Sequence, residues 1–270
     1  MPAKIQLSKE QINEMLRLKT KEKMSYETIG KIFGVSAQTV SRQLKLLDID
    51  PVALSMKYKY DEYYFHNIDT TEKAYWLGFI TADGYLNEER RHFHFHLGWK
   101  DREHLEKFLQ AIHGEMKVKQ EVHSLTGNFI ATLNIDGTQF SEDLVKNGVR
   151  QKKSAKEKPP TTIPDKFIRD YIRGLFDGDG CIFGHRIDLR SSYDMCKWVQ
   201  EILIKECNIP KTKIMFDSNI YRIAVSKGFL KVLKWLYYSG CSNSSLQRKY
   251  EHARLILLKN KWLKSFKTAV

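Results

Sequence analysis

The sequence predicts an α+β protein built from two similar halves, with a small all-helical unit in front of them. A nine-residue phrase occurs twice, as Trp76–Gly84 (WLGFITADG) and Ile172–Gly180 (IRGLFDGDG), 96 positions apart. After the first copy, apolar and polar residues alternate, which is the period of a half-buried β-strand. The first 50 residues carry helix start signals instead. Together these observations indicate a duplicated unit of helices and strands.

Residues 1–50 predict a helix-turn-helix domain. Ser8 with Gln11 makes a capping box, while Gly34 supplies a turn and Ser36 starts the next helix. That helix would present polar side chains to the major groove of DNA. These side chains are Gln38, Thr39, Arg42 and Lys45. The alternative is a three-helix module used for protein contact.

Residues 51–68 form a predicted connector. Asp50 precedes Pro51, and the residue before a proline is disfavoured in helical geometry, so the first domain ends here. The stretch from Met56 to Tyr64 is rich in Lys and Tyr. Such a segment either follows a phosphate backbone or simply stays solvated, and the sequence favours neither.

The first half is predicted to span residues 69–158. Its motif helix starts at Thr70 or Thr71 and ends before Gly84. A strand over 92–100, a helix over 102–113 and strands over 116–123 and 129–136 follow. Alternation places the polar residues of these strands on one sheet face. They are His92, His94, His96, Lys100, Lys117, Lys119, His123, Thr132 and Asn134. The three histidines could suggest zinc, but no carboxylate or cysteine at a recognisable spacing completes a ligand set.

The second half is predicted to span residues 159–270 and to repeat this order. A motif helix after Pro164, a strand, a helix over 193–207 and two further strands are expected. The polar residues on the sheet face are Arg186, Asp188, Arg190, Lys213, Asp217, Arg222 and Ser226. Helix-plus-two-strand units in this order make a four-stranded antiparallel sheet in each half, with helices on one face.

The repeated phrase places small residues and carboxylates at defined points of two helices. Gly78 with Ala82, and Gly174 with Gly178, lie four apart and share a helix face, so they allow the two helices to pack closely. The glycine that ends each phrase is expected to adopt a left-handed turn. The aspartates before these glycines then lie at two negative helix ends. If the ends converge, a cation such as Mg²⁺ is needed to stabilise them.

These residues resemble the motifs of the LAGLIDADG homing endonucleases, over roughly residues 61 to 265. The resemblance implies two pseudo-symmetric αββαββα halves whose sheets form a DNA-binding saddle. It also implies a metal site at the motif ends, comprising Asp83, Asp179, Ala82 and Gly178, for Mg²⁺ or for Mn²⁺ or Ca²⁺ in its place. Thr81 stands where the motif has an acidic residue, whereas the second copy keeps Asp177. Because that position is generally not the catalytic one, activity is still implied.

The resemblance further implies a basic residue from each half beside the metal, orienting the attacking water. Lys153 and Lys249 each lie 70 positions after their motif aspartate, and Lys152 is an alternative to Lys153. The implied reaction is a Mg²⁺-dependent double-strand break in a long DNA target, with short 3′ overhangs.

The composition points to a polyanionic partner. The chain has 45 Lys and Arg against 32 Asp and Glu, a formal net charge of +13. Double-stranded DNA is the expected partner of a monomer. Two alternatives stay open, namely an intron-RNA maturase and a DNA-binding regulator without catalysis. The four cysteines show no CxxC spacing, and no stretch of 18 apolar residues occurs. The chain is therefore expected to be intracellular, cytoplasmic or phage-encoded in a bacterial host, without a membrane span.

Overall fold

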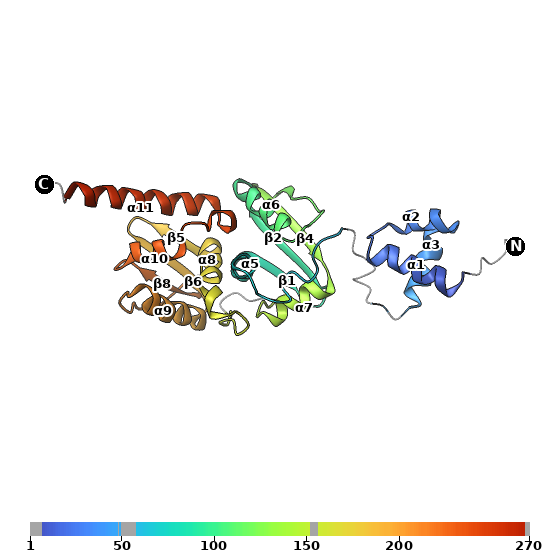
Figure 1. Cartoon of the computed structure of the whole chain (residues 1–270), viewed down its shortest axis with the longest axis horizontal. Helices are drawn as coiled ribbons and strands as arrows, with labels where there is room; N and C mark the ends of the chain where they lie inside the picture. Colours follow the sequence, from blue (N-terminus) through green and yellow to red (C-terminus); the bar gives the residue numbers. More distant parts are fainter. Residues whose placement is uncertain (1–6, 48, 50–57, 152–155, 268–270) are drawn as a thin grey trace.

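The computed structural model describes residues 7–47, 49, 58–151 and 156–267, with backbone alone for 261–267. Three helices near the N-terminus stand apart from a larger body made of two halves (Figure 1). Each half contains one four-stranded antiparallel sheet, and helices α5 (Thr71–Asp83) and α8 (Ile168–Asp179) lie side by side between the sheets. The predicted α+β class with two repeated halves is confirmed.

The N-terminal unit is a helix-turn-helix. It consists of α1 (Lys9–Thr20), α2 (Tyr26–Phe33) and α3 (Ala37–Lys45). The predicted capping box is present, since Ser8 Oγ accepts from the Gln11 amide at 3.2 Å and Gln11 Oε1 accepts from the Ser8 amide at 2.9 Å. Gly34 has a left-handed φ of 66°. A small core holds the unit together, comprising Met15, Leu18, Ile29, Val40 and Leu44.

Part of the predicted connector packs into the first half. Tyr64, Phe65 and Ile68 are buried in its core, so this segment is ordered by apolar contact. Two ion pairs link the connector to the turn after α1: Lys59 Nζ lies 2.7 Å from Glu22 Oε2, and Lys23 Nζ lies 3.0 Å from Glu62 Oε1. Residues 51–57 fall outside the described residues, and the predicted domain boundaries stay predictions.

The first half runs from α5 (Thr71–Asp83) through β1 (Gly84–Asn87), β2 (His92–Gly98), α6 (Arg102–Ala111), β3 (Lys119–Val122) and β4 (Phe129–Asp136) to α7 (Thr138–Lys146). The strand order is β1-β2-β4-β3. Lys100 is not on the sheet, because η1 (Trp99–Asp101) ends the strand and leads into α6. Lys117 and His123 also lie outside β3. The Glu115 amide binds Lys59 O of the connector, and His123 O accepts from Gly127 to begin the hairpin turn.

The second half repeats the arrangement. It contains η2 (Asp165–Phe167), α8 (Ile168–Asp179), β5 (Gly180–Phe183), β6 (Arg186–Ser191), α9 (Tyr193–Cys207), β7 (Met215–Asp217), β8 (Ile220–Val225), α10 (Phe229–Leu236), η3 (Ser242–Ser244) and α11 (Gln247–Lys267). The strand order is β5-β6-β8-β7. Lys213 precedes β7 and Ser226 follows β8, so neither lies on a strand. The segment before β7 is held by a hydrogen bond from Gln200 Nε2 of α9 to Thr212 O at 2.8 Å.

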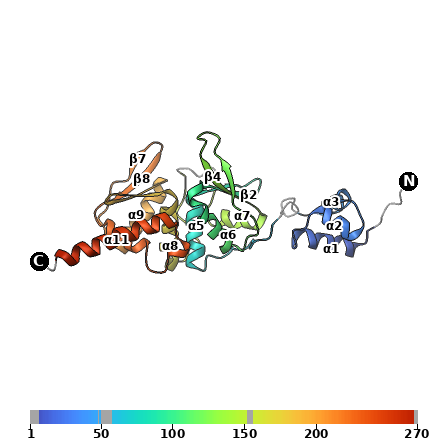
Figure 2. The ribbon, with the colours of Figure 1, turned by 90° about the horizontal axis from the view of Figure 1, so that it is seen from above.

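The hairpins that carry β4 and β7–β8 project toward the same side of the molecule, whereas α6, α8 and α11 lie on the other side (Figure 2). Among the described helices, none combines the length and the apolar character needed to span a membrane.

Candidate active site and nucleic-acid interface

The two motif helices touch through their backbones. A Cβ atom added at Gly78 would lie 2.0 Å from Tyr171 O, and one added at Gly174 would lie 2.2 Å from Tyr75 O. Real Cβ atoms do not approach backbone oxygen so closely, so only glycine permits this contact. The small-residue stripe predicted from the sequence is therefore the helix interface.

Two reciprocal hydrogen bonds cross this interface. Tyr75 Oη donates to Asp177 Oδ2 at 2.8 Å, and Tyr171 Oη donates to Thr81 Oγ1 at 3.2 Å. The four residues are related by the 96-residue repeat. Thr81 Oγ1 in turn donates to Leu77 O at 2.8 Å. The departure from the motif at Thr81 is thus explained, because a hydroxyl oxygen can accept from tyrosine as a carboxylate does.

Asp177 is a structural residue of the second motif. Its side chain is fully buried and accepts from three donors: Tyr75 Oη, Tyr237 Oη at 2.6 Å and the Leu246 amide at 2.8 Å. Burial raises the pKa of Asp177, although the hydrogen bonds oppose the shift. Asp177 therefore joins α8 to the other half, to the end of α10 and to the start of α11.

Asp83 and Asp179 are the last residues of α5 and α8. The left-handed turn predicted after them is wrong: Gly84 and Gly180 have extended backbones, with φ of −78° and −90°. Each helix passes directly into a strand. Glycine is required there for space, since a Cβ at Gly180 would lie 2.5 Å from Phe176 O.

The two motif ends lie together. A Cβ at Gly178 would be 2.3 Å from Ala82 Cβ and 3.3 Å from Asp83 Oδ2, so the Asp83 carboxylate lies against the last turn of α8. Asp83 is half-buried, whereas Asp179 is exposed. Neither helix carries a basic residue in its last turn. Two negative helix ends, each finishing in an aspartate, therefore share one region.

Lys249 of α11 caps this region. Its ammonium group, with three N–H donors, lies within hydrogen-bond distance of four backbone carbonyls, those of Phe176 (2.8 Å), Asp177 (2.7 Å), Gly178 (3.2 Å) and Gly180 (2.6 Å). The side chain is 8% exposed. Burial lowers the pKa of Lys249, while the carboxylates of Asp177 and Asp83 oppose the shift. Lys249 thus neutralises the end of α8. Its predicted counterparts Lys153 and Lys152 lie outside the described residues.

The donor set suits a hard cation. In the part of the chain that the structure describes, no three His, Cys, Asp or Glu side chains are grouped to hold a metal. The available ligands are two carboxylates and the backbone carbonyls of the motif ends. Mg²⁺ commonly binds proteins in this way, through one or two carboxylates, with water and substrate phosphate completing its shell. The residues present therefore fit Mg²⁺ better than zinc.

The sheet of the first half presents the polar face predicted from alternation. His92, His94 and His96 pair with Asp136, Asn134 and Thr132, and Lys119 also pairs with Thr132. A groove of about 670 Å³ lies along this face and is bordered by the connector. Its polar lining includes Tyr58, Lys117, Lys119, Asn134 and Asp136.

Three aromatic rings on this face form a stack. The ring centroids of Tyr85 and His94 are 4.6 Å apart, and those of His94 and His96 are 4.4 Å apart. Partial burial, together with the neighbouring His96 and His92, lowers the pKa of His94 to about 4. His94 is therefore uncharged at neutral pH, and it presents a flat polar ring on this face.

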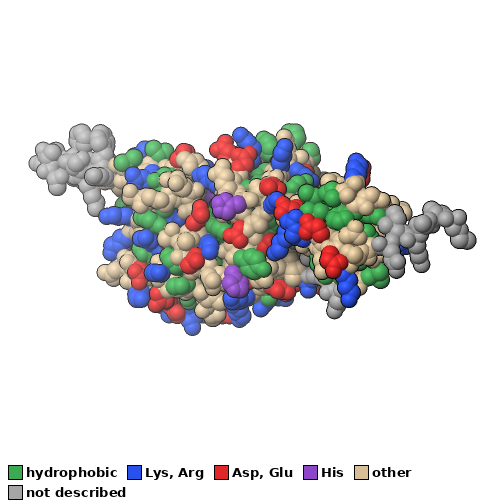
Figure 3. All heavy atoms as spheres, turned by 45° about the vertical axis from the view of Figure 1, so that its right-hand side comes forward, with side chains coloured by type: hydrophobic (Ala, Val, Ile, Leu, Met, Phe, Trp, Pro, Cys, Tyr) green, Lys and Arg blue, Asp and Glu red, His purple; other side chains and the backbone are tan. Residues whose placement is uncertain are grey.

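In the helix-turn-helix, α3 presents the side chains predicted for DNA contact. Gln38, Arg42 and Lys45 are exposed and Thr39 is half-buried. Basic and acidic side chains are intermixed over the surface in Figure 3, so the positive charge is not gathered into one patch on that side.

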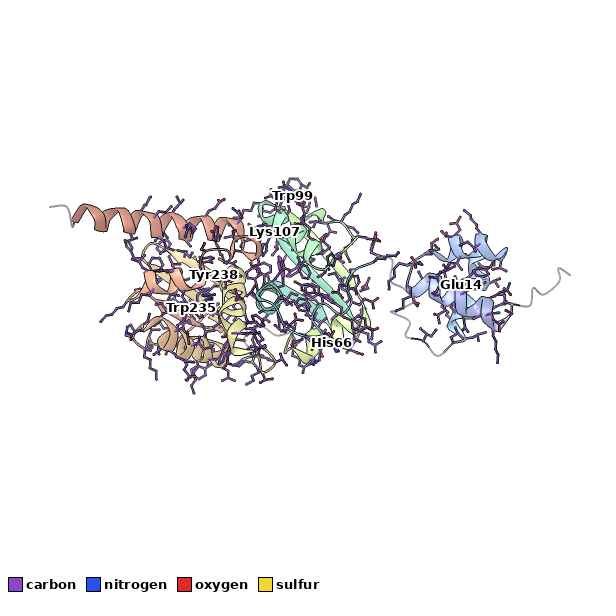
Figure 4. All side chains as sticks on the ribbon, in the orientation of Figure 1. Glu14, His66, Trp99, Lys107, Trp235 and Tyr238 are labelled. Carbon is purple, nitrogen blue, oxygen red and sulfur yellow. The ribbon has the colours of Figure 1, made fainter. Side chains whose placement is uncertain are left out.

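His104 was not predicted from the sequence. It lies on α6, 3% exposed, with Nε2 2.9 Å from Tyr75 Oη. Because the hydroxyl of Tyr75 donates to Asp177, we infer that His104 donates to Tyr75. Lys107, one turn further along α6, lies near the start of α11 (Figure 4). The apolar period of α6, with Leu105 and Phe108 buried, was the signal that His104 faces inward.

Acid is expected to destabilise the fold through His104. Burial lowers the pKa of His104 to about 3, against about 6.5 when unfolded. The unfolded chain then binds more protons below pH 6.5, so stability present above that pH is lost as pH falls toward 3. Between pH 7 and 4.5 the loss is about 2.5 kcal/mol. Urea unfolding at both values measures it.

His104→Phe should reduce this pH dependence by that amount, since phenylalanine does not titrate. His252→Gln, at an exposed position of α11, is the matched control and should leave the dependence unchanged. Equal pH dependence in all three proteins would contradict the assignment.

Comparison with known proteins gives one curated relative. No family model matches the chain. The replication factor C small subunit of Methanocaldococcus jannaschii is 27% identical over 170 residues, which are 60% of this chain and 9% of that protein. The chain thus spans only a small part of the curated relative that it matches.

Solved structures with similar folds include two homing endonucleases. I-WcaI bound to its DNA recognition sequence is 12% identical, with a TM-score of 0.48, over 76% of this chain and 96% of that chain. I-LtrWI bound to target DNA is 11% identical, with a TM-score of 0.46, over 71% and 91%. Full-length DUF199/WhiA from Thermatoga maritima is 17% identical, with a TM-score of 0.47, over 77% and 70%. All of these TM-scores are below 0.5, so the similarities carry no argument about this chain.

Proposed function

We propose that this protein is a site-specific DNA endonuclease that makes a metal-dependent double-strand break. The observation that carries the proposal is the close approach of the two motif-helix ends, each of which finishes in an aspartate. Carboxylates at helix C-termini oppose the helix dipole and so cost stability. Their presence at both ends is explained if they bind a cation. The net charge of +13 and the polar sheet faces support DNA as the substrate.

Asp83 and Asp179 would hold Mg²⁺, or Mn²⁺ or Ca²⁺ in its place, with the carbonyl oxygens of Ala82 and Gly178. The bound ion supplies an activated water and neutralises charge at the phosphodiester. The chain supplies the positions: the glycine contacts hold the two motif helices together, and Lys249 holds the end of α8. The two closely spaced sites suit cleavage of both strands with short 3′ overhangs.

DNA contacts are assigned to three surfaces. The first-half sheet contributes His92, His94, His96, Lys119 and Asn134, with Lys117 and His123 beside it. The second-half sheet contributes Arg186, Asp188, Arg190 and Arg222, with Lys213 beside it. The third surface is α3 of the helix-turn-helix, with Gln38, Thr39, Arg42 and Lys45. Lys100 lies on the turn before α6, beyond the end of β2, and is proposed to contact DNA only at the edge of the first-half sheet.

A regulator that binds DNA without cutting it is the second candidate. One observation favours it: the Lys249 ammonium lies among four backbone carbonyls, which leaves it less able to orient a water in the way that the resemblance implied. An intron-RNA maturase has no comparable support in the described residues.

The proposal is tested by incubating the full chain with duplexes enriched by binding from a random library. With Mg²⁺, cleavage of both strands at a fixed position is expected, and EDTA should abolish it while binding persists. Mapping the ends tests the overhang. Sequence-specific binding without cleavage in Mg²⁺ or Mn²⁺ would contradict the endonuclease and support the regulator.

A further inference from the structure

Acidic side chains lie between arginines on the polar face of the second-half sheet. Asp188 Oδ1 is 2.8 Å from Arg186 Nε, and its Oδ2 is 3.7 Å from Arg222 Nη1. Asp217 Oδ2 is 3.4 Å from Arg190 Nη2. The Asp188 side chain is 12% exposed, whereas those of Arg186 and Arg190 are 40% and 50% exposed.

The strand register places these groups on one face. Asp188 pairs with Cys181 and Ala224, and Arg190 pairs with Arg222. Ile187 and Leu189, which alternate with them in β6, are buried in the core. The arginines therefore point away from the helices, on the side proposed to face DNA.

A carboxylate on a DNA-facing surface repels phosphate, so these aspartates do not serve phosphate binding. Each holds one side of a guanidinium group, whose five donors have a fixed planar geometry. Asp188 Oδ1 and Arg186 Nε form an ion pair without hydrogen-bond geometry, so charge attraction is what restrains this guanidinium. A guanidinium held in this way has lost much of its rotamer freedom before it binds, which lowers the entropic cost of recognition.

Guanine is the base whose hydrogen-bond acceptors match a guanidinium group held in this way. Guanine presents two acceptors in the major groove, N7 and O6, and arginine binds both at once. The strands of the first half contain no arginine. Their polar face carries imidazole, amide and ammonium groups instead, so the two halves differ in the base chemistry that they can read.

We infer that the second half reads guanines through Arg186 and Arg190, with Asp188 and Asp217 as positioning residues. The inference rests on the proposed function in so far as DNA is the substrate, but it does not require cleavage. The half of the target under β5–β8 then contains guanines that depend on these arginines, while the half under β1–β4 does not.

The test is selection of bound duplexes from a random library by the full chain in EDTA, followed by sequencing. Guanine should be enriched at two or more positions of one half-site. Arg186→Lys and Arg190→Lys keep the charge but lose the planar fork. Each should lower the preference for guanine at its own position by about 10- to 100-fold, with total affinity changed less.

Asp188→Asn should weaken the preference at the Arg186 position while leaving the Arg190 position unchanged, which a general loss of structure would not do. Arg254→Lys, at an exposed position of α11, is the matched control and should select the wild-type sequence. A selected sequence with no guanine enriched in either half-site, or one unchanged in both arginine variants, would overturn this inference alone. Selection of no sequence would overturn both the inference and the proposed function.

Discussion

Asp83→Asn and Asp179→Asn are each expected to abolish double-strand cleavage while leaving DNA affinity nearly unchanged. An amide has the shape of the carboxylate but no charge, so it is a poor ligand for Mg²⁺. Loss of metal-assisted charge stabilisation should lower the cleavage rate on the order of 10³-fold. Single-turnover cleavage in Mg²⁺ and filter binding in EDTA measure the two effects separately.

The stability of these variants separates a functional carboxylate from a structural one. A negative charge at a helix C-terminus is unfavourable by roughly 0.3–1 kcal/mol. Removing it at Asp83 or Asp179 should therefore change the free energy of unfolding by no more than about 1 kcal/mol. If both variants still cut both strands at the wild-type rate, the assignment of the active site is wrong.

Asp177→Asn provides the matched control from the same helical turn. Asp177 is fully buried and accepts three hydrogen bonds. An amide would direct its NH₂ group at one of these donors, leaving buried polar groups unpaired at a cost of about 2–4 kcal/mol. This variant should lose stability first, and any loss of cleavage should follow the fraction unfolded.

The fold could be predicted from the sequence because helices and strands show themselves in the spacing of residues close together in the chain. The four-residue spacing of Gly78 with Ala82 and the alternation from His92 to Leu97 were enough to place a helix contact and a sheet face. The ends of strands were less predictable. β3 begins only at Lys119 because the chain before it bonds to the connector at Lys59, a contact between residues distant in the sequence.

The candidate site was predictable only in part, for the same reason. The aspartates followed from the repeat, but the partners of Lys249 did not, since spacing cannot show which groups a long side chain reaches. The same holds for Asp177, whose three donors come from α5, from the residue after α10 and from the residue before α11. Gly84 and Gly180 showed a further limit: glycine was needed for space at a helix–strand junction, not for a left-handed turn.

Gly78→Ala is expected to have the largest effect on stability of any methyl addition in the chain's motif helices. The new Cβ would lie 2.0 Å from Tyr171 O and 2.8 Å from Tyr171 C. Both are backbone atoms of a buried helix and cannot rotate away, so the two helices must separate. Overpacking of this kind costs about 3 kcal/mol or more, and urea unfolding measures it.

Separation of the helices should also lower cleavage more than stability alone predicts, because it moves Asp83 away from Asp179. Gly98→Ala is the matched control: its Cβ would meet only the Lys100 side chain, at 4.0 Å, and its backbone has negative φ. That variant should unfold within about 0.5 kcal/mol of the wild type. If Gly78→Ala were equally stable and fully active, the close backbone contact would not be what fixes the distance between the two motif aspartates, and the geometric basis of the proposed site would fall.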